Sequence, residues 1–180
     1  NPESFAHYGF RSYFTDRARG VVLRLSRDGL SEISAHGCKD YFKDNLAIFD
    51  ILMGSFDDSK DLYNITMTSS SNRGGEDTVS FKEQVTGWPS RKSFIPEFAL
   101  TLNNIYYSWK NGEMYSHNNP VRNYFYGNQY DSRLKLIFNE TPSTIKSFKT
   151  ISYEGSRSRI LQDLRVGSWK DGAAEMVAGD

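Results

Sequence analysis

One local pattern recurs along the chain: a short run in which apolar and polar residues alternate, then a tight polar turn, then another such run. In the segment 20–34, alternating apolar residues precede Asp28-Gly29, and further along Asn103-Asn104 and Asn111-Gly112 separate similar runs. Alternation is typical of a strand with one buried face, and these residue pairs accept the positive φ of hairpin turns. We therefore predict a mainly β fold of consecutive antiparallel hairpins, propeller-like or sandwich, with one or two short helices.

The same pattern predicts at least seven strands and no helix longer than about four turns. Beyond the first hairpin, strand-like alternation occupies 51–56, 62–67, 78–85, 98–102, 105–109, 114–117, 132–138 and 151–155. Apolar residues near helical spacing predict a helix within 36–49, with Ser34 as its cap. Thr141 before a proline predicts a second helix from Pro142 to Lys149.

An aromatic residue followed by a polar turn and a return strand recurs at Phe14, Phe56 and Trp109. The intervals are 42 and 53 residues. Propeller blades repeat every ~40–50 residues, so this recurrence keeps the propeller-like arrangement open.

Proline interrupts one aromatic segment, 88–100, with the sequence WPSRKSFIPEFAL. Pro89 and Pro96 cannot donate to a sheet ladder, so the segment cannot form a central strand throughout. We interpret it as a connector that packs over a sheet edge, and the alternative is a contact surface.

Charge and cysteine content narrow the class of protein. Lysine plus arginine equals aspartate plus glutamate at 22 each, so no global charge steers the chain toward nucleic acid. A single cysteine excludes an internal disulfide and favours folding in a reducing cytoplasm. No apolar run reaches the roughly 20 residues of a membrane helix, and the start NPESFAHYGF has no signal-peptide core. Neither end of the sequence resembles a natural terminus, so we expect one β-rich segment, 1–180, from a longer chain.

No residue is predicted to be catalytic, to bind a cofactor or to ligate a metal. The histidines are far apart and match no metal-ligand spacing, so we expect turn or surface positions for His7, His36 and His117. Cys38 lies among apolar residues of the first predicted helix, and we expect a buried structural thiol there.

Clustered aspartates at Asp57, Asp58 and Asp61 could suggest calcium, because hard cations prefer carboxylates. The glycine and terminal glutamate of an EF-hand loop are missing, so we expect a solvated hairpin tip. Asn64 and Asn139 begin glycosylation sequons. We discard both, because Asn64 lies in a predicted strand and no signal peptide is present.

Arginines gather near the N-terminus, at Arg11, Arg17, Arg19, Arg24 and Arg27, with Tyr13 and Phe14 among them. Basic residues interleaved with aromatics are compatible with nucleic-acid contact. The neutral chain and the absence of a binding motif favour another interpretation, in which the arginines form the polar face of a strand. They would then pair with carboxylates of a neighbouring chain.

Four stretches, 19–46, 51–67, 78–119 and 132–160, together resemble a virion structural protein family of tailed bacteriophages. The likeness is to large tail-associated proteins of cyanophage-like viruses and, more loosely, to tail nozzle or muzzle proteins, which carry propeller-like β domains. The resemblance implies a part of the tail, baseplate or nozzle that is made in the host bacterial cytoplasm and assembled into the virion. It implies other virion proteins and copies of the chain as partners, and it offers no catalytic residues to transfer. From the neutral charge, the lack of a membrane-length apolar run and the lack of binding motifs, we expect no membrane, nucleic-acid or cofactor partner.

Two other function classes stay open. A carbohydrate- or receptor-binding β module would use Trp88, Tyr106, Tyr107 and Trp109 as stacking platforms. A tail-associated hydrolase domain would need carboxylates that converge from distant strands, and no two carboxylates are singled out by the sequence.

Overall fold

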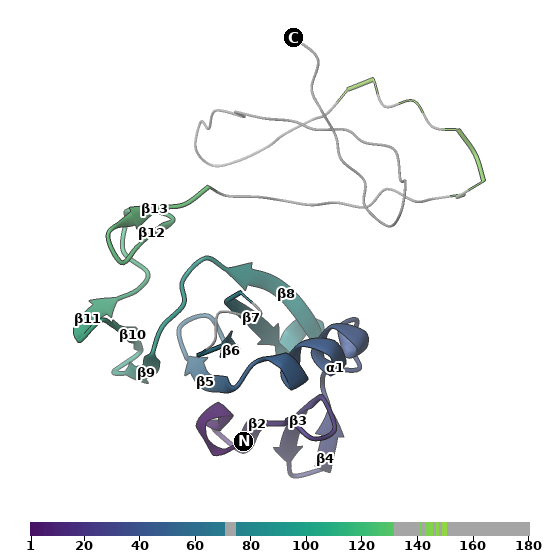
Figure 1. The fold of residues 1–180 in the computed structure, drawn as a ribbon, viewed down its shortest axis with the longest axis horizontal. Helices are drawn as coiled ribbons and strands as arrows, with labels where there is room; N and C mark the ends of the chain where they lie inside the picture. The colour runs from purple at the N-terminus through teal and green to yellow at the C-terminus, as the bar shows by residue number, and fades with distance from the viewer. Residues whose placement is uncertain (71–74, 132–140, 142, 146, 148, 151–180) are drawn as a thin grey trace. The chain divides into compact units, whose positions relative to one another are not determined.

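Antiparallel strands dominate the computed structural model, which describes residues 1–70, 75–131, 141, 143–145, 147, 149 and 150 (Figure 1). The chain divides into two compact units, Asn1–Leu134 and Lys135–Asp180. All thirteen strands of the described residues lie in the first unit. The prediction of a mainly β fold with at least seven strands is confirmed. That residues 1–180 form one β-rich segment of a longer chain stays a prediction.

The strands form three sheets and a short ribbon. The first sheet contains β1 (Ala6–Tyr8), β2 (Arg11–Asp16), β3 (Val21–Ser26) and β4 (Gly29–Glu32), in that spatial order. The second sheet contains β5 (Ile51–Asp57), β6 (Leu62–Thr68), β7 (Asp77–Lys82) and β8 (Gly87–Lys92), also in order. The third sheet has the order β11 (Glu113–Ser116), β10 (Ile105–Lys110), β9 (Phe98–Leu102). The ribbon pairs β12 (Tyr124–Phe125) with β13 (Asn128–Gln129), and the described sheets do not close into a barrel.

Turn chemistry explains the consecutive hairpins. Asn103 and Asn104 have φ of 52° and 61°, and Asn111 and Gly112 have φ of 54° and 77°, so both pairs form the left-handed two-residue turns that hairpins favour. Gly29 has φ of 98°, as the sequence predicted. It pairs with Ser26 as the first residue of β4, so the turn lies one residue earlier than Asp28-Gly29.

The second sheet is the middle layer, and one of its faces packs against the first sheet. Tyr13 of β2 stacks on Phe56 and Tyr63, with ring centroids 5.7 and 4.9 Å apart. A continuous core forms between the two sheets, as in a sandwich; its fourteen buried residues are Ala6, Tyr13, Val22, Ile33, Phe42, Leu46, Phe49, Leu52, Phe56, Tyr63, Ile65, Met67, Val79 and Phe81. The propeller-like alternative stays a prediction.

The opposite face of the second sheet packs against the third sheet. Alternation along β5 turns Met53 and Ser55 away from the first core. Met53 joins Phe94, Ala99 and Tyr106 in a second, smaller core. β6 is therefore buried on both faces, which alternation alone did not predict.

One α-helix, α1 (Lys39–Ile48), covers the first core with Phe42 and Leu46 and lies beside the second sheet (Figure 1). Its N-cap is Cys38, so the prediction of Ser34 as the cap was wrong. The Ser34 hydroxyl is buried instead, where it donates to Glu32 and accepts from the backbone N–H of Val22.

Several sequence expectations fail at the ends of the second sheet. Part of the predicted connector 88–100 is strand β8, and Pro89 is tolerated there because β8 is an edge strand. The run 78–85 ends earlier than predicted, because η2 (Glu83–Val85) follows β7 and Val85 is exposed.

Three predicted elements lie wholly or partly outside the described residues. The strands 132–138 and 151–155 lie outside the described residues. Of the predicted helix from Pro142 to Lys149, the described residues 143–145, 147 and 149 have no helical conformation.

Candidate functional site

The outward face of the third sheet carries large apolar side chains. Register places Trp109 opposite both Phe98 and Met114, and Ile105 opposite Leu102. Every second side chain of a strand lies on the same face, so Leu100 and Tyr107, which pair with each other, share the face of these residues. We define this apolar face as Phe98, Leu100, Leu102, Ile105, Tyr107, Trp109 and Met114.

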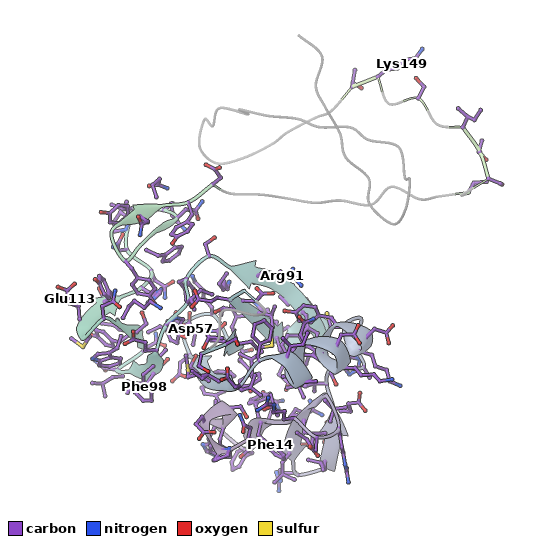
Figure 2. The ribbon with its side chains drawn as sticks, in the orientation of Figure 1. Phe14, Asp57, Arg91, Phe98, Glu113 and Lys149 are labelled. Carbon is purple, nitrogen blue, oxygen red and sulfur yellow. The ribbon has the colours of Figure 1, made fainter. Side chains whose placement is uncertain are left out.

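Much of the apolar face is open to solvent. Phe98 is 52% exposed, Leu102 66%, Ile105 41% and Met114 60%. Leu100, Tyr107 and Trp109 are half-buried, and the Trp109 ring tilts against the Phe98 ring with centroids 5.6 Å apart. Figure 2 labels Phe98 on this sheet, together with Glu113 at its turn. Contiguous apolar surface of this kind marks an interaction site more often than scattered exposed residues do.

Polar contacts fix the underside of the same sheet. The Tyr106 hydroxyl lies 2.7 Å from the Ser55 Oγ, and both residues are buried. Thr101 donates its hydroxyl to the carbonyl oxygen of Phe56 at 2.6 Å and accepts the backbone N–H of Asp58. Burial raises the pKa of Tyr106 well above its usual range, so this anchor stays protonated. These contacts hold the third sheet on the second and leave the apolar face outward.

His117 completes the underside and is not the surface histidine predicted from sequence. Its ring packs against Phe94, Tyr106 and Phe125, with centroids 4.7, 5.0 and 5.8 Å away. Its Nε2 lies 2.7 Å from the Ser108 hydroxyl. Burial lowers the pKa of His117 to about 4, so the imidazole is neutral at pH 7.

A serine hydroxyl beside a histidine ring nitrogen is the arrangement that activates a nucleophile, and Ser108 and His117 form such a pair. Ser108 is fully buried, and its hydroxyl also lies 2.8 Å from the Tyr126 hydroxyl. In this structure the Ser108 oxygen is closed off from solvent. The contact between Ser108 and His117 therefore serves as a structural link between β10 and the residues directly after β11.

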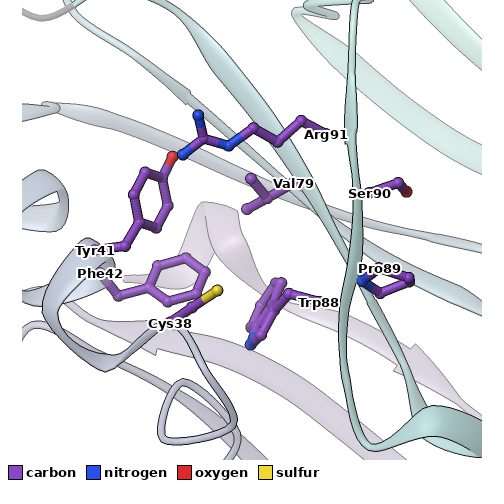
Figure 3. A pocket seen from close by; sticks show the side chains of 8 residues that line it. All are labelled: Cys38, Tyr41, Phe42, Val79, Trp88, Pro89, Ser90 and Arg91. Atoms are coloured by element: carbon purple, nitrogen blue, oxygen red, sulfur yellow. The ribbon is translucent and has the colours of Figure 1, made fainter. Parts of the chain in front are cut away.

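A pocket of about 220 Å³ opens between α1 and β8, lined by Cys38, Tyr41, Phe42, Val79, Trp88, Pro89, Ser90 and Arg91 (Figure 3). Its volume lies below the ~300–1,000 Å³ of typical small-molecule sites. Arg91 lies over the Tyr41 ring at 4.6 Å and pairs with Asp77. Cys38 lines this pocket half-buried, and burial raises the pKa of its thiol, which reduces its reactivity.

Residues 120–165 match the family model of the Crassvirus muzzle protein C-terminal domain. The match indicates a phage virion protein family. It covers about a quarter of the chain's 180 residues. No curated protein matches the chain. Of the two resemblances seen in the sequence, the match agrees with the one to muzzle proteins, and the likeness to cyanophage-like viruses stays a prediction.

The described start of the matched segment contacts the second core. The short strands β12 and β13 lie within the matched segment. Phe125 packs its ring against Phe94, with centroids 5.3 Å apart, and the Tyr126 ring contacts Tyr115 at 4.9 Å. The matched segment thus begins where the third sheet is anchored.

The predicted role of the arginines was wrong for Arg24. Its Nη1 lies 2.7 Å from the Glu83 carboxylate of the same chain, and Arg11 lies 3.9 Å from that carboxylate. Arg27 lies over the exposed ring of Phe10, with 5.8 Å to the centroid. The remaining arginines contact their own chain too: Arg17 donates to the carbonyl oxygen of Ala47, and Arg19 pairs with Asp16.

The aspartate cluster divides between strand and turn. Asp57 is buried at the end of β5, where its carboxylate accepts the backbone N–H and the hydroxyl of Ser59, so the prediction of a solvated tip was wrong for this residue. Asp58 and Asp61 lie in the following turn. Within the part of the chain that the structure describes, no three His, Cys, Asp or Glu side chains are placed to hold a metal. No helix among those residues is long and apolar enough to cross a membrane.

The remaining candidates fall in different places. His7 and His36 are exposed, as predicted. Asn64 is buried in β6, where its side-chain oxygen accepts the Ser80 hydroxyl, and Asn139 lies outside the described residues. Trp88 packs against Phe42 and donates its ring N–H to the carbonyl oxygen of Ile33.

Only two of the four predicted stacking aromatics lie on the apolar face. Tyr106 is buried and is not a stacking platform, and the half-buried Trp88 lies apart from the apolar face, packed on the first core. Tyr107 and Trp109 remain available there. Sequence reasoning missed the apolar face as a whole, although the predicted runs 98–102, 105–109 and 114–117 contain its members.

Proposed function

We propose that this chain is a structural subunit of the tail nozzle of a tailed-phage virion and works through protein–protein contacts, without a reaction of its own. The match of residues 120–165 to a muzzle protein domain carries the proposal. The geometry supports it, because the third sheet offers an outward apolar face and the described serine–histidine pair is enclosed. The subunit would be made in the host bacterial cytoplasm and would contact other virion proteins and copies of itself.

The location of the chain in the particle tests this proposal. We expect antibodies against residues 1–131 to detect the chain in purified virions and to label the tail end in immunogold electron microscopy. Particles whose tails have been sheared off serve as the control and should lose the label. Detection in infected-cell extracts but never in virions would contradict the proposal, and labelling over the capsid would contradict the nozzle position.

One observation favours a second candidate, the carbohydrate- or receptor-binding module. Tyr107 and Trp109 share the apolar face, and flat rings on one face can stack on sugars. The aliphatic majority of that face fits a protein partner better, because sugar sites also need polar groups to orient hydroxyls. Glycan-array binding that is lost in Trp109→Ala would favour the module over the nozzle subunit.

A further inference from the structure

We infer that the apolar face of the third sheet binds the same face of a second copy of this chain. This inference names a partner for the contacts proposed above and so rests on that proposed function. The third sheet presents its more apolar side to solvent. Its inward side contributes Ala99, Thr101, Tyr106 and Ser108, whereas its outward side is the apolar face. Antiparallel sheets usually turn their more polar side to water, so an outward side that is more apolar than the inward one marks a surface for a partner.

The area of the face suits a protein partner. Taking about 200 Å² for a fully exposed large side chain, the exposed fractions of Phe98, Leu102, Ile105 and Met114 correspond to roughly 440 Å² of apolar surface. The three half-buried residues of the face add to this area. Two such faces would remove roughly 900 Å² from water through the four exposed residues alone, close to the ~1,000 Å² expected of a biological interface, before the half-buried residues and any polar rim are counted. Trp109 and Phe98 are aromatic anchors of the kind that dominate binding energies.

Charge favours a second copy of the same face. The apolar face contains no charged side chain, because Lys110 and Glu113 point to the other side of the sheet at its turn. Contact between two identical faces therefore buries no unpaired charge. The chain has a net charge of zero, so two copies do not repel each other at long range.

A rival surface lies on the outward side of the first sheet and is less suitable. Leu25 and Leu30 pair there and are 47% and 56% exposed. Asp16 and Glu32 share that side, so covering it with an apolar partner would desolvate two carboxylates.

The pairing of apolar face with apolar face gives a two-fold dimer, in which each copy contributes the same residues.

The underside contacts prepare the face for binding. Two hydrogen bonds, Tyr106 to Ser55 and Thr101 to Phe56, hold the third sheet on the second sheet in the single chain. A surface held in its bound shape loses less conformational entropy on association.

Sedimentation velocity of the full 180-residue chain tests the inference, over about 1–200 µM, the range where an interface of modest area associates. We expect a reversible monomer–dimer equilibrium. Met114→Glu places a charge in the face at an exposed position, and we expect at least tenfold weaker association. Leu102→Glu is a second variant at the opposite edge of the face, with the same expected result.

Leu30→Glu is the matched control, because Leu30 is an exposed leucine on the first sheet. It should dimerise as the unchanged chain does, and circular dichroism checks that all three variants are folded. A chain that stays monomeric at every concentration would overturn the inference, as would a dimer that only Leu30→Glu weakens or that no variant weakens. A monomer that is nevertheless present in virions would overturn this inference alone, and a dimer absent from virions would overturn the proposed function alone.

Discussion

Glu83 connects the first and second sheets through side chains far apart in the sequence. Its carboxylate pairs with Arg24 at 2.7 Å and accepts the Tyr13 hydroxyl at 2.8 Å. The Glu83 side chain is only 13% exposed and that of Arg24 is 23% exposed, so solvent screens this pair less than a surface salt bridge. Burial and the bond to Glu83 raise the pKa of Tyr13 beyond its usual range.

Reversing the charge at Arg24 should therefore weaken the fold itself. Arg24→Glu sets two carboxylates together in a partly buried place, and we expect a loss of about 2 kcal/mol or more in the free energy of unfolding. Arg27→Glu is the matched control in the same strand region, exposed over Phe10, and should change stability by no more than about 0.5 kcal/mol. Urea unfolding measures both. Equal effects of the two variants would contradict the role of Glu83.

Gly54 is a residue that no local pattern explains. A Cβ at this position would lie 1.9 Å from the carbonyl oxygen of Ser4, which belongs to the short helix η1 (Pro2–Ser4). That carbonyl also accepts the Tyr63 hydroxyl at 2.8 Å. The constraint comes from a segment fifty residues away, so it became visible only when the fold was known.

At the scale of elements, local chemistry predicted most hairpins correctly. Asn111-Gly112 predicts its turn because both residues accept positive φ, and this requirement does not depend on the rest of the fold. β8 was missed because Pro89 excludes only central strands, and sequence alone could not place Gly87–Lys92 at an edge. The apolar face was missed because alternation separates two faces of β10 without saying which is covered.

His117 makes the third sheet sensitive to acid. Burial lowers its pKa to about 4, against the opposing influence of Asp57 and with the help of Lys60. The unfolded chain binds a proton at higher pH than the folded chain. The stability from the neutral ring is therefore complete above about pH 6.5 and is lost as pH falls toward 4.

We expect this loss to be of the order of 2 kcal/mol at pH 4. His117→Gln keeps a polar partner for Ser108 but cannot titrate in this range, so its free energy of unfolding should depend less on pH between about 4 and 6.5. His36→Gln is the control, because His36 is exposed in a turn. Urea unfolding at several pH values compares the variants, and identical slopes for all three proteins would contradict the assignment.

At the scale of the whole first unit, the second sheet serves two cores of unequal size. Within the described residues, fourteen buried side chains form the core shared with the first sheet and four form the core shared with the third. Hydrophobic stabilisation grows with the apolar area buried, so the third sheet is attached more weakly than the first. It is also the sheet that presents the apolar face.

This inequality predicts graded protection of backbone amides in native-state hydrogen exchange. Amides of β6 and β7 should exchange slowest, because opening them disrupts the larger core, whereas those of β9–β11 should open through a local fluctuation of lower free energy.

If two copies pair through the apolar face, protection in β9–β11 should also rise with protein concentration, since association stabilises the bound form by mass action. Met114→Glu should remove that concentration dependence and leave β6 and β7 unchanged. Uniform protection across all three sheets would contradict the two-core interpretation, because it would mean that the unit opens only as a whole.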